Sequence, residues 1–127
     1  ITHKSIIFTD VNFMKKTAQT GSNGEILAQE FLKSKNYQIL FTNWRHKHSE
    51  IDIIAQDGKV IVFVEVKTRT NLSFGNPENF VNEQKMKKMQ EAAEAYIEQF
   101  DWQGELRFDI ISIEKNNKIT HFEDAFY

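Results

Sequence analysis

The sequence contains no cysteine, one proline and five glycines among its 127 residues. Without cysteine, the chain can form neither disulfides nor a thiolate metal site. No stretch has the Pro/Gly composition of a linker, and no run of about 18 apolar residues is present to span a membrane. The start of the chain also lacks the long apolar stretch of a secretory signal. We therefore expect one domain, located in the cytoplasm, with no membrane partner.

Apolar residues are spaced as on one face of a helix over 23–35, and again from about 82 to near 104. Runs rich in β-branched and aromatic residues predict strands between and after these helices. The predicted strands are 37–46, 50–55, 59–69, 107–114 and 118–123, with a loop at 71–79. The order αβββαββ predicts an α/β fold in which the helices pack on a central mixed sheet.

The second and third predicted strands form a hairpin, because Asp57-Gly58 favours a two-residue type I′ turn. The facing pairs are then Gln56 with Lys59, Asp52 with Phe63, Glu50 with Glu65, and His48 with Lys67. Side chains alternate along a strand, so Glu50, Asp52, Glu65 and Lys67 are predicted to share one face. Asp52 and Glu65 become diagonal neighbours, about 7–8 Å apart at the backbone.

The other side of this hairpin is predicted to be apolar, formed by Val60, Val62, Val64 and Val66 with Ile51 and Ile53. The charged side also begins with apolar residues and becomes charged only toward one end. This pattern indicates a site at the margin of a hydrophobic core.

Two converging carboxylates repel each other unless a cation lies between them, and oxygen ligands of this kind suit Mg²⁺ or Mn²⁺. Lys67, two residues from Glu65, would neutralise phosphate charge or help to deprotonate an attacking water. These are the components of metal-assisted phosphodiester hydrolysis. The alternative is that Glu65 and Lys67 are ordinary solvated charges at the end of a hairpin.

At these residues the sequence resembles the PD-(D/E)XK nuclease superfamily, with Ile51-Asp52 in place of Pro-Asp and Glu65-Val66-Lys67 as the second element. More specifically, it resembles the YraN-like group, uncharacterised protein family 0102, which is similar to archaeal Holliday-junction resolvases. The stretches that carry the resemblance are G-x-x-G-E at 21–25, NWR at 43–45, EIDIIA at 50–55, VFVEVKTR at 62–69, FG at 74–75, Lys85, and RFDI at 107–110.

The resemblance covers residues 21–127 and implies a nuclease-like domain with a restriction-endonuclease-like fold, preceded by an N-terminal extension over 1–20. Two positions depart from the group: Ser49 stands where it usually has Gly, and Asp124 where it often has Asn. Both departures concern local turn shape, and neither falls on the expected metal ligands.

The resemblance implies that Asp52 and Glu65 hold the metal, and that Glu25 and Lys67 complete the catalytic group. For Glu25 a structural role stays open, because Ser22 and Glu25 also fit a helix capping box.

Further basic and aromatic residues lie near these motifs. Arg45, Arg69 and Lys85 are predicted phosphate contacts, since a cation beside a metal site neutralises remaining phosphate charge. Other candidates are assigned to ordinary roles: His46, His48, Lys87 and Lys88 to the solvated surface, and Trp44 to burial in the sheet.

We expect a Mg²⁺- or Mn²⁺-dependent hydrolase, an endonuclease that acts on DNA and prefers branched or junction forms. A homodimer is predicted, because cutting both strands of a junction needs two sites. Two alternatives remain: an inactive nucleic-acid-binding or scaffold protein, which the acidic pI of about 6.1 favours, and a nuclease for RNA.

Overall fold

The computed structural model describes residues 5–8, 23–69 and 83–126. Its elements, in chain order, are β1 (Ser5–Phe8), α2 (Asn23–Ser34), β2 (Gln38–His46), β3 (Ser49–Asp57), β4 (Val60–Arg69), α3 (Glu83–Phe100), β5 (Glu105–Glu114) and β6 (Ile119–Phe122). The predicted order αβββαββ is confirmed from α2 onward. β1 was not predicted, and the predicted loop at 71–79 lies outside the described residues.

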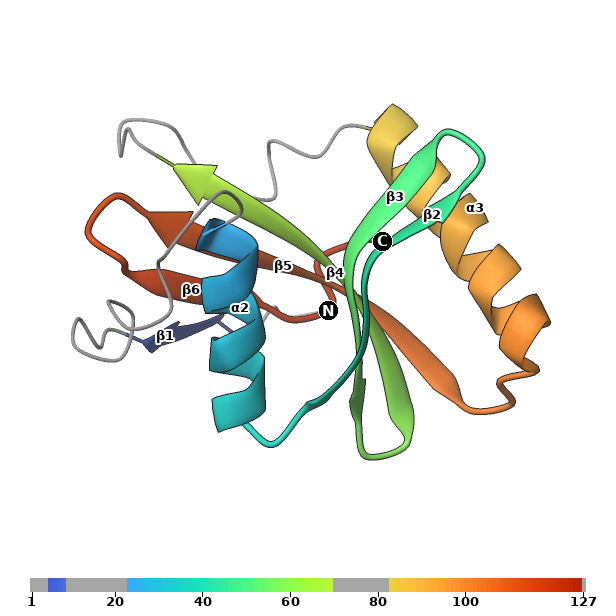
Figure 1. Cartoon of the computed structure of the whole chain (residues 1–127), viewed down its shortest axis with the longest axis horizontal. Helices are drawn as coiled ribbons and strands as arrows, with labels where there is room; N and C mark the ends of the chain where they lie inside the picture. The colour runs from blue at the N-terminus through green and yellow to red at the C-terminus, as the bar shows by residue number, and fades with distance from the viewer. Residues whose placement is uncertain (1–4, 9–22, 70–82, 127) are drawn as a thin grey trace.

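A mixed sheet of six strands forms the centre, in the order β1-β6-β5-β4-β3-β2 (Figure 1). β4 and β5 run parallel, and the other four strand pairs are antiparallel. Helix α3 lies in the connection from β4 to β5, as a parallel pair requires. The mixed sheet predicted from the sequence is therefore confirmed. β1, inside the predicted extension 1–20, adds the edge strand beside β6.

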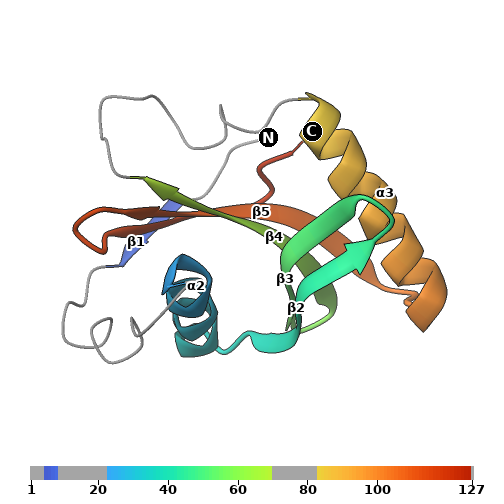
Figure 2. The same ribbon diagram turned by 45° about the horizontal axis from the view of Figure 1, so that its top comes forward.

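The two helices cover opposite faces of the sheet (Figures 1 and 2). Val62 and Val64 of β4 pack in a buried cluster with α2, whereas Ile61 and Phe63 pack in one with α3. β4 is thus buried on both sides, which explains why its sequence is a nearly continuous apolar run. Neither helix in the described part of the chain is long and apolar enough to span a membrane.

The β3–β4 turn differs from the prediction. Asp57 pairs with Val60, so the loop residues are Gly58 and Lys59 rather than Asp57 and Gly58. Gly58 has a φ of 61°, and glycine at the first loop position is typical of a type II′ turn. The predicted facing pairs are therefore wrong. Because the shift is by two residues, the side chains within the paired ladder, from Ile53 to Asp57 and from Val60 to Val64, keep their predicted faces. The corrected register brings Asp52 level with Glu65 rather than with Phe63, one position beyond the last pair.

Ile51 does not lie on the apolar surface where it was predicted. It packs with Phe63 and Tyr96 in the α3 cluster, whereas Ile53 packs in the α2 cluster. In a regular strand the two would point the same way. The β3–β4 pairing ends at Ile53 and Val64, and beyond that point β3 pairs only with β2. The strand therefore turns about its own axis around Asp52.

A buried ionic network lies on the α2 side of the sheet and is centred on Asp109. Arg107 donates to both carboxylate oxygens of Asp109 at 2.8 Å, and the Nε2 atom of His121 lies 2.7 Å from Oδ2. The backbone N–H of Asp124 donates to Oδ1 at 3.0 Å. This network accounts for the RFDI motif, because it ties β5 to β6 and to the C-terminal segment that follows.

Lys35 and Tyr37 connect the same network to the end of α2. The Nζ atom of Lys35 lies 2.7 Å from Nδ1 of His121, and Arg107 also donates to the Tyr37 hydroxyl at 2.8 Å. Lysine has only donors, so Nδ1 accepts and the Nε2–H of His121 donates to Asp109. Burial alone raises the pKa of Asp109, but the hydrogen bonds from His121 and Arg107 hold it below the ordinary value.

Replacing Asp109 by Asn should lower the free energy of unfolding by about 3–5 kcal/mol, because Arg107 loses its buried counter-charge. The pKa of Asp109 is lowered from 3.8 on folding, so its contribution is full above this value and is lost progressively as the pH falls through the lower pKa of the folded state. Urea unfolding of both proteins between neutral pH and about pH 3 should show their stabilities converging on acidification. Glu91→Gln, on the exposed side of α3, is the control. It should change neither the free energy of unfolding nor its dependence on pH.

Candidate metal-dependent active site

The candidate site lies where β3 and β4 separate. Beyond the last pair, Ile53 with Val64, the backbone N–H of Val66 donates to Oδ2 of Asp52 at 2.8 Å. A side-chain carboxylate thus replaces the carbonyl that would continue the ladder. Figures 1 and 2 show β3 bending away with β2 toward α3, while β4 continues beside β5. The divergence opens the surface next to Asp52.

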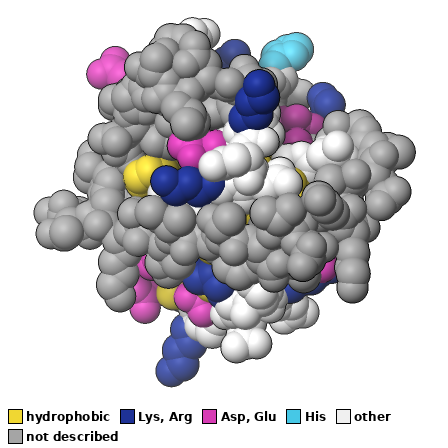
Figure 3. Space-filling model, turned by 90° about the vertical axis from the view of Figure 1, so that its left-hand side faces the viewer, with side chains coloured by type: hydrophobic (Ala, Val, Ile, Leu, Met, Phe, Trp, Pro, Cys, Tyr) yellow, Lys and Arg dark blue, Asp and Glu magenta, His cyan; other side chains and the backbone are white. Residues whose placement is uncertain are grey.

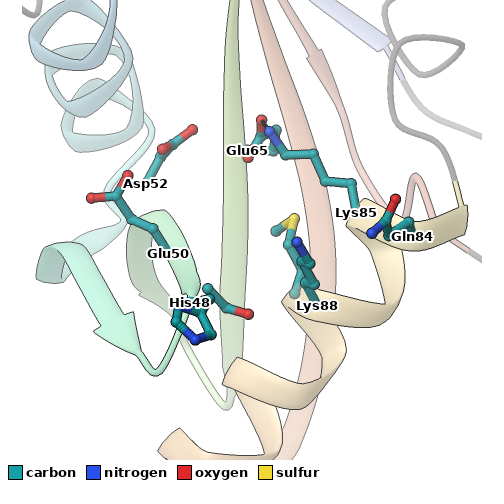
Figure 4. Close-up of a pocket in the computed structure, with 9 residues that line it drawn as sticks. His48, Glu50, Asp52, Glu65, Gln84, Lys85 and Lys88 are labelled. Atoms are coloured by element: carbon teal, nitrogen blue, oxygen red, sulfur yellow. Dashed lines mark ion pairs between the residues drawn. The ribbon is translucent and has the colours of Figure 1, made fainter.

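A pocket of about 360 Å³ occupies this opening (Figure 4). Its lining residues are His48, Ser49, Glu50, Asp52, Glu65, Gln84, Lys85, Lys88 and Met89. The three acids come from β3 and β4, and the two lysines come from the first turns of α3. One wall of the pocket is therefore acidic, and the opposite wall carries positive charge.

Glu65 is the buried member of the acidic wall, with 3% of its surface exposed. Its Oε2 atom lies 2.5 Å from Nζ of Lys85 and 3.4 Å from Nζ of Lys67. A carboxylate removed from water is costly unless cations and hydrogen bonds compensate it. The two lysines supply that compensation, and this explains why a buried strand contains a Glu-x-Lys sequence.

Asp52 is the member of the acidic wall whose ionised form is disfavoured. Burial, followed by the negative charge of Glu65, raises the pKa of Asp52 to about 7, although the Val66 N–H opposes the shift. The charge of Glu25 adds to the increase. Ionised Asp52 and Glu65 therefore repel each other, and a divalent cation between them would remove the repulsion.

The charge of Glu65 destabilises the ionised form of Asp52 but stabilises the charged form of Lys85. Burial by itself lowers the pKa of Lys85, but the hydrogen bond and the charge of Glu65 raise it above the ordinary value. Its ammonium group therefore remains charged beside the carboxylate. Lys85 acts as the counter-ion of Glu65 in the protein without metal.

The structure brings together four of the predicted site residues: Asp52, Glu65, Lys67 and Lys85. Glu25, in the first turn of α2, is close enough for its charge to act on Asp52. Ser22, its predicted capping partner, lies outside the described residues. The capping role therefore stays a prediction.

Arg45 and Arg69 are the predicted phosphate contacts that the structure does not place in the pocket. Arg45 lies on β2 with 75% of its side chain exposed, and its Nη2 atom is 3.3 Å from Oε2 of Glu50. It is not among the pocket-lining residues. The side chain of Arg69 is outside the described part of the structure.

Five of the pocket-lining residues were not predicted from the sequence to belong to the site: His48, Ser49, Gln84, Lys88 and Met89. His48 and Lys88 had been assigned to the solvated surface, and Gln84 had no assigned role. For Lys88 the sequence did contain a usable signal. Its i, i+3 spacing from Lys85, a predicted site residue, places both lysines on one face of the helix. Trp44 was predicted to be buried, but it is only partly buried; it packs edge-on against Tyr96, with ring centroids 5.5 Å apart.

Asp52 and Glu65 are two carboxylates available to a divalent ion in this pocket. Within residues 5–8, 23–69 and 83–126, no group of three or more His, Asp or Glu side chains is arranged to hold a metal. Mg²⁺ commonly takes only one or two carboxylates and completes its coordination with water and substrate phosphate. Asp52 and Glu65 therefore fit Mg²⁺ or Mn²⁺ better than an ion that needs a complete protein cage.

Comparison with known proteins identifies the family. Uncharacterised protein family UPF0102 matches residues 24–113. The chain belongs to this family. A UPF0102 protein of Flavobacterium psychrophilum is 48% identical over 110 residues, covering 84% of this chain and 92% of that protein. One from Thermodesulfovibrio yellowstonii is 44% identical over 109 residues, covering 86% and 96%.

These matches confirm the resemblance to the YraN-like group of the PD-(D/E)XK superfamily. Among solved structures, SfsA of Pyrococcus furiosus in complex with Ca²⁺ matches 88% of this chain and 62% of that chain, with 13% identity. Its TM-score of 0.30 is too low to support an argument about this chain.

Asp52→Asn should stabilise the protein when no divalent metal is present. Folding raises the pKa of Asp52 from 3.8 to about 7, so stability falls as the pH rises through this interval, and the full cost remains above it. Asn keeps an acceptor for the Val66 N–H but removes the charge. At pH 8 in EDTA we expect a gain of about 1–3 kcal/mol in urea unfolding, and no gain near pH 4.

Glu50→Gln is the matched control for this measurement, because Glu50 lines the same pocket but is already paired with exposed Arg45. Its effect on stability should be small at both pH values. Equal stabilisation by the two substitutions would show that the effect is general to the acidic wall and not specific to the Asp52–Glu65 pair.

Proposed function

We propose that this protein is a Mg²⁺- or Mn²⁺-dependent endonuclease that hydrolyses phosphodiester bonds in DNA and prefers branched or junction forms. The observation that supports it most is the pairing of buried Glu65 with Asp52, whose pKa is raised to about 7, at an open pocket. A carboxylate with a raised pKa, beside a second carboxylate in a pocket, is typical of a functional site.

In this proposal Asp52 and Glu65 hold the ion through their carboxylate oxygens. When bound, the ion polarises a phosphoryl oxygen and lowers the pKa of a bound water. With such an ion bound, Glu65 would no longer depend on the lysines for charge compensation. The ammonium groups of Lys67 and Lys85, which lie at Glu65, would then be able to donate to phosphate oxygens.

The preference for branched DNA rests on how the site would recognise its substrate. Figure 3 shows a side of the molecule on which Lys and Arg side chains lie beside Asp and Glu side chains, and the pI is about 6.1. In this proposal, DNA is therefore bound mainly by phosphate contacts inside the pocket and not by a broad basic surface. Contacts of this kind position a nucleic acid without reading its bases.

A homodimer and a cytoplasmic location complete the proposal. A junction has two strands to cut, and a two-fold dimer presents two identical sites to them. The absence of cysteine agrees with a reducing compartment.

The alternative is an inactive nucleic-acid-binding or scaffold protein with the same fold. It is favoured by the ion pair between Lys85 and Glu65, which satisfies Glu65 without a metal. In that case the lysines would be permanent counter-ions, and divalent metal would bind weakly or not at all.

Cleavage of a labelled four-way DNA junction in Mg²⁺, resolved on a denaturing gel, decides between these functions. Lys67→Met should reduce the rate by about 100-fold or more, because the ammonium beside Glu65 is lost from the transition state. Lys59→Met, in the exposed β3–β4 turn, is the control and should cut like the unmodified protein.

A junction of the same sequence made of RNA tests the substrate, and faster cutting of RNA would transfer the proposal to an RNA nuclease. If neither Mg²⁺ nor Mn²⁺ supports cutting of either junction, the scaffold alternative stands. Cutting that persists unchanged in Lys67→Met would also contradict the proposed site.

A further inference from the structure

The wall of the pocket formed by α3 has a cation that the proposed chemistry does not use. Gln84, Lys85, Lys88 and Met89 line this wall, and His48, from the turn between β2 and β3, lies across from it (Figure 4). Lys85 is engaged by Glu65. Lys88 has an exposed side chain at the same pocket, one helical turn further along α3.

The two lysines lie one turn apart on the face of α3 that borders the pocket. Residues three apart on a helix have Cβ atoms about 5–6 Å from each other. Two long cationic side chains this close can contact neighbouring phosphates of one strand, with Lys85 at the phosphate nearest Glu65.

The position on the helix adds to this preference. Lys85 lies in the first turn of α3, Glu83–Phe100, where the helix dipole contributes positive potential, and Lys88 lies in the turn that follows. Lys87 belongs to the same turns and is also exposed, but it is not among the pocket-lining residues. The fold thus separates two neighbouring lysines that look equivalent in the sequence.

We propose that Lys88, together with His48, binds the phosphate adjacent to the one that is cut, so that the site takes a polynucleotide strand and not a mononucleotide. This inference rests on the proposed nuclease function, because the cut phosphate is placed at Asp52 and Glu65. His48 approaches from the β2–β3 turn, so the strand is held between that turn and α3.

Binding of a fluorescein-labelled four-way DNA junction, followed by fluorescence anisotropy in Mg²⁺, tests this role. All proteins carry Lys67→Met, so that the junction stays intact. Adding Lys88→Met should weaken binding about 3- to 10-fold and reduce the slope of log affinity against log salt by about one. Lys87→Met should leave both quantities unchanged.

His48→Ala provides a second arm, with His46→Ala as its control. His46 stacks on Trp44, with ring centroids 6.4 Å apart, and is not among the pocket-lining residues. His48→Ala should weaken junction binding several-fold, whereas His46→Ala should bind like the parent protein. Thermal unfolding of all four variants checks that each is folded.

Equal losses for Lys88→Met and Lys87→Met would indicate general surface charge and overturn the inference. So would a Lys88→Met protein that binds as tightly as its parent. If the unmodified protein cuts the junction and the Lys88→Met protein shows either result, only this inference is lost. If the unmodified protein neither binds nor cuts the junction, the proposed nuclease function is lost as well.

Discussion

The hydrogen bond from the Val66 N–H to the Asp52 carboxylate is the interaction on which the site depends. It occurs where the β3–β4 ladder ends, and it gives a backbone donor a side-chain acceptor in place of the missing carbonyl. β3 is then able to turn away with β2 while β4 remains in the sheet. The same bond holds Asp52 beside Glu65, so one contact both opens the pocket and sets its acidic wall.

Among the residues that the structure describes, two carboxylates are buried, and their surroundings differ. Asp109 is fully buried in a closed network with Arg107 and His121, and its pKa is lowered. Glu65 borders an open pocket, where it raises the pKa of neighbouring Asp52. The first arrangement stabilises the folded chain, whereas the second leaves a repulsion between ionised Asp52 and Glu65 that a divalent cation would relieve.

Much of the fold followed from local patterns. Helical and alternating periodicity predicted the order αβββαββ and the mixed sheet, and β1 was missed because a four-residue strand carries little pattern. The hairpin register was wrong by two residues, since Gly58 takes the first loop position. The prediction that Asp52 and Glu65 share a face survived this error, because a two-residue shift preserves the alternation of side chains.

The sequence by itself determined the family, the strand that carries Glu65 and Lys67, and the face of that strand, because these depend on residue identity and period alone. Only the tertiary structure decided that β3 turns away at Asp52, that Lys85 reaches Glu65, and that Lys88 enters the pocket while Lys87 does not. Those outcomes depend on how α3 packs against a sheet whose strands diverge. Contacts between segments so far apart in the chain leave no periodic signal in it.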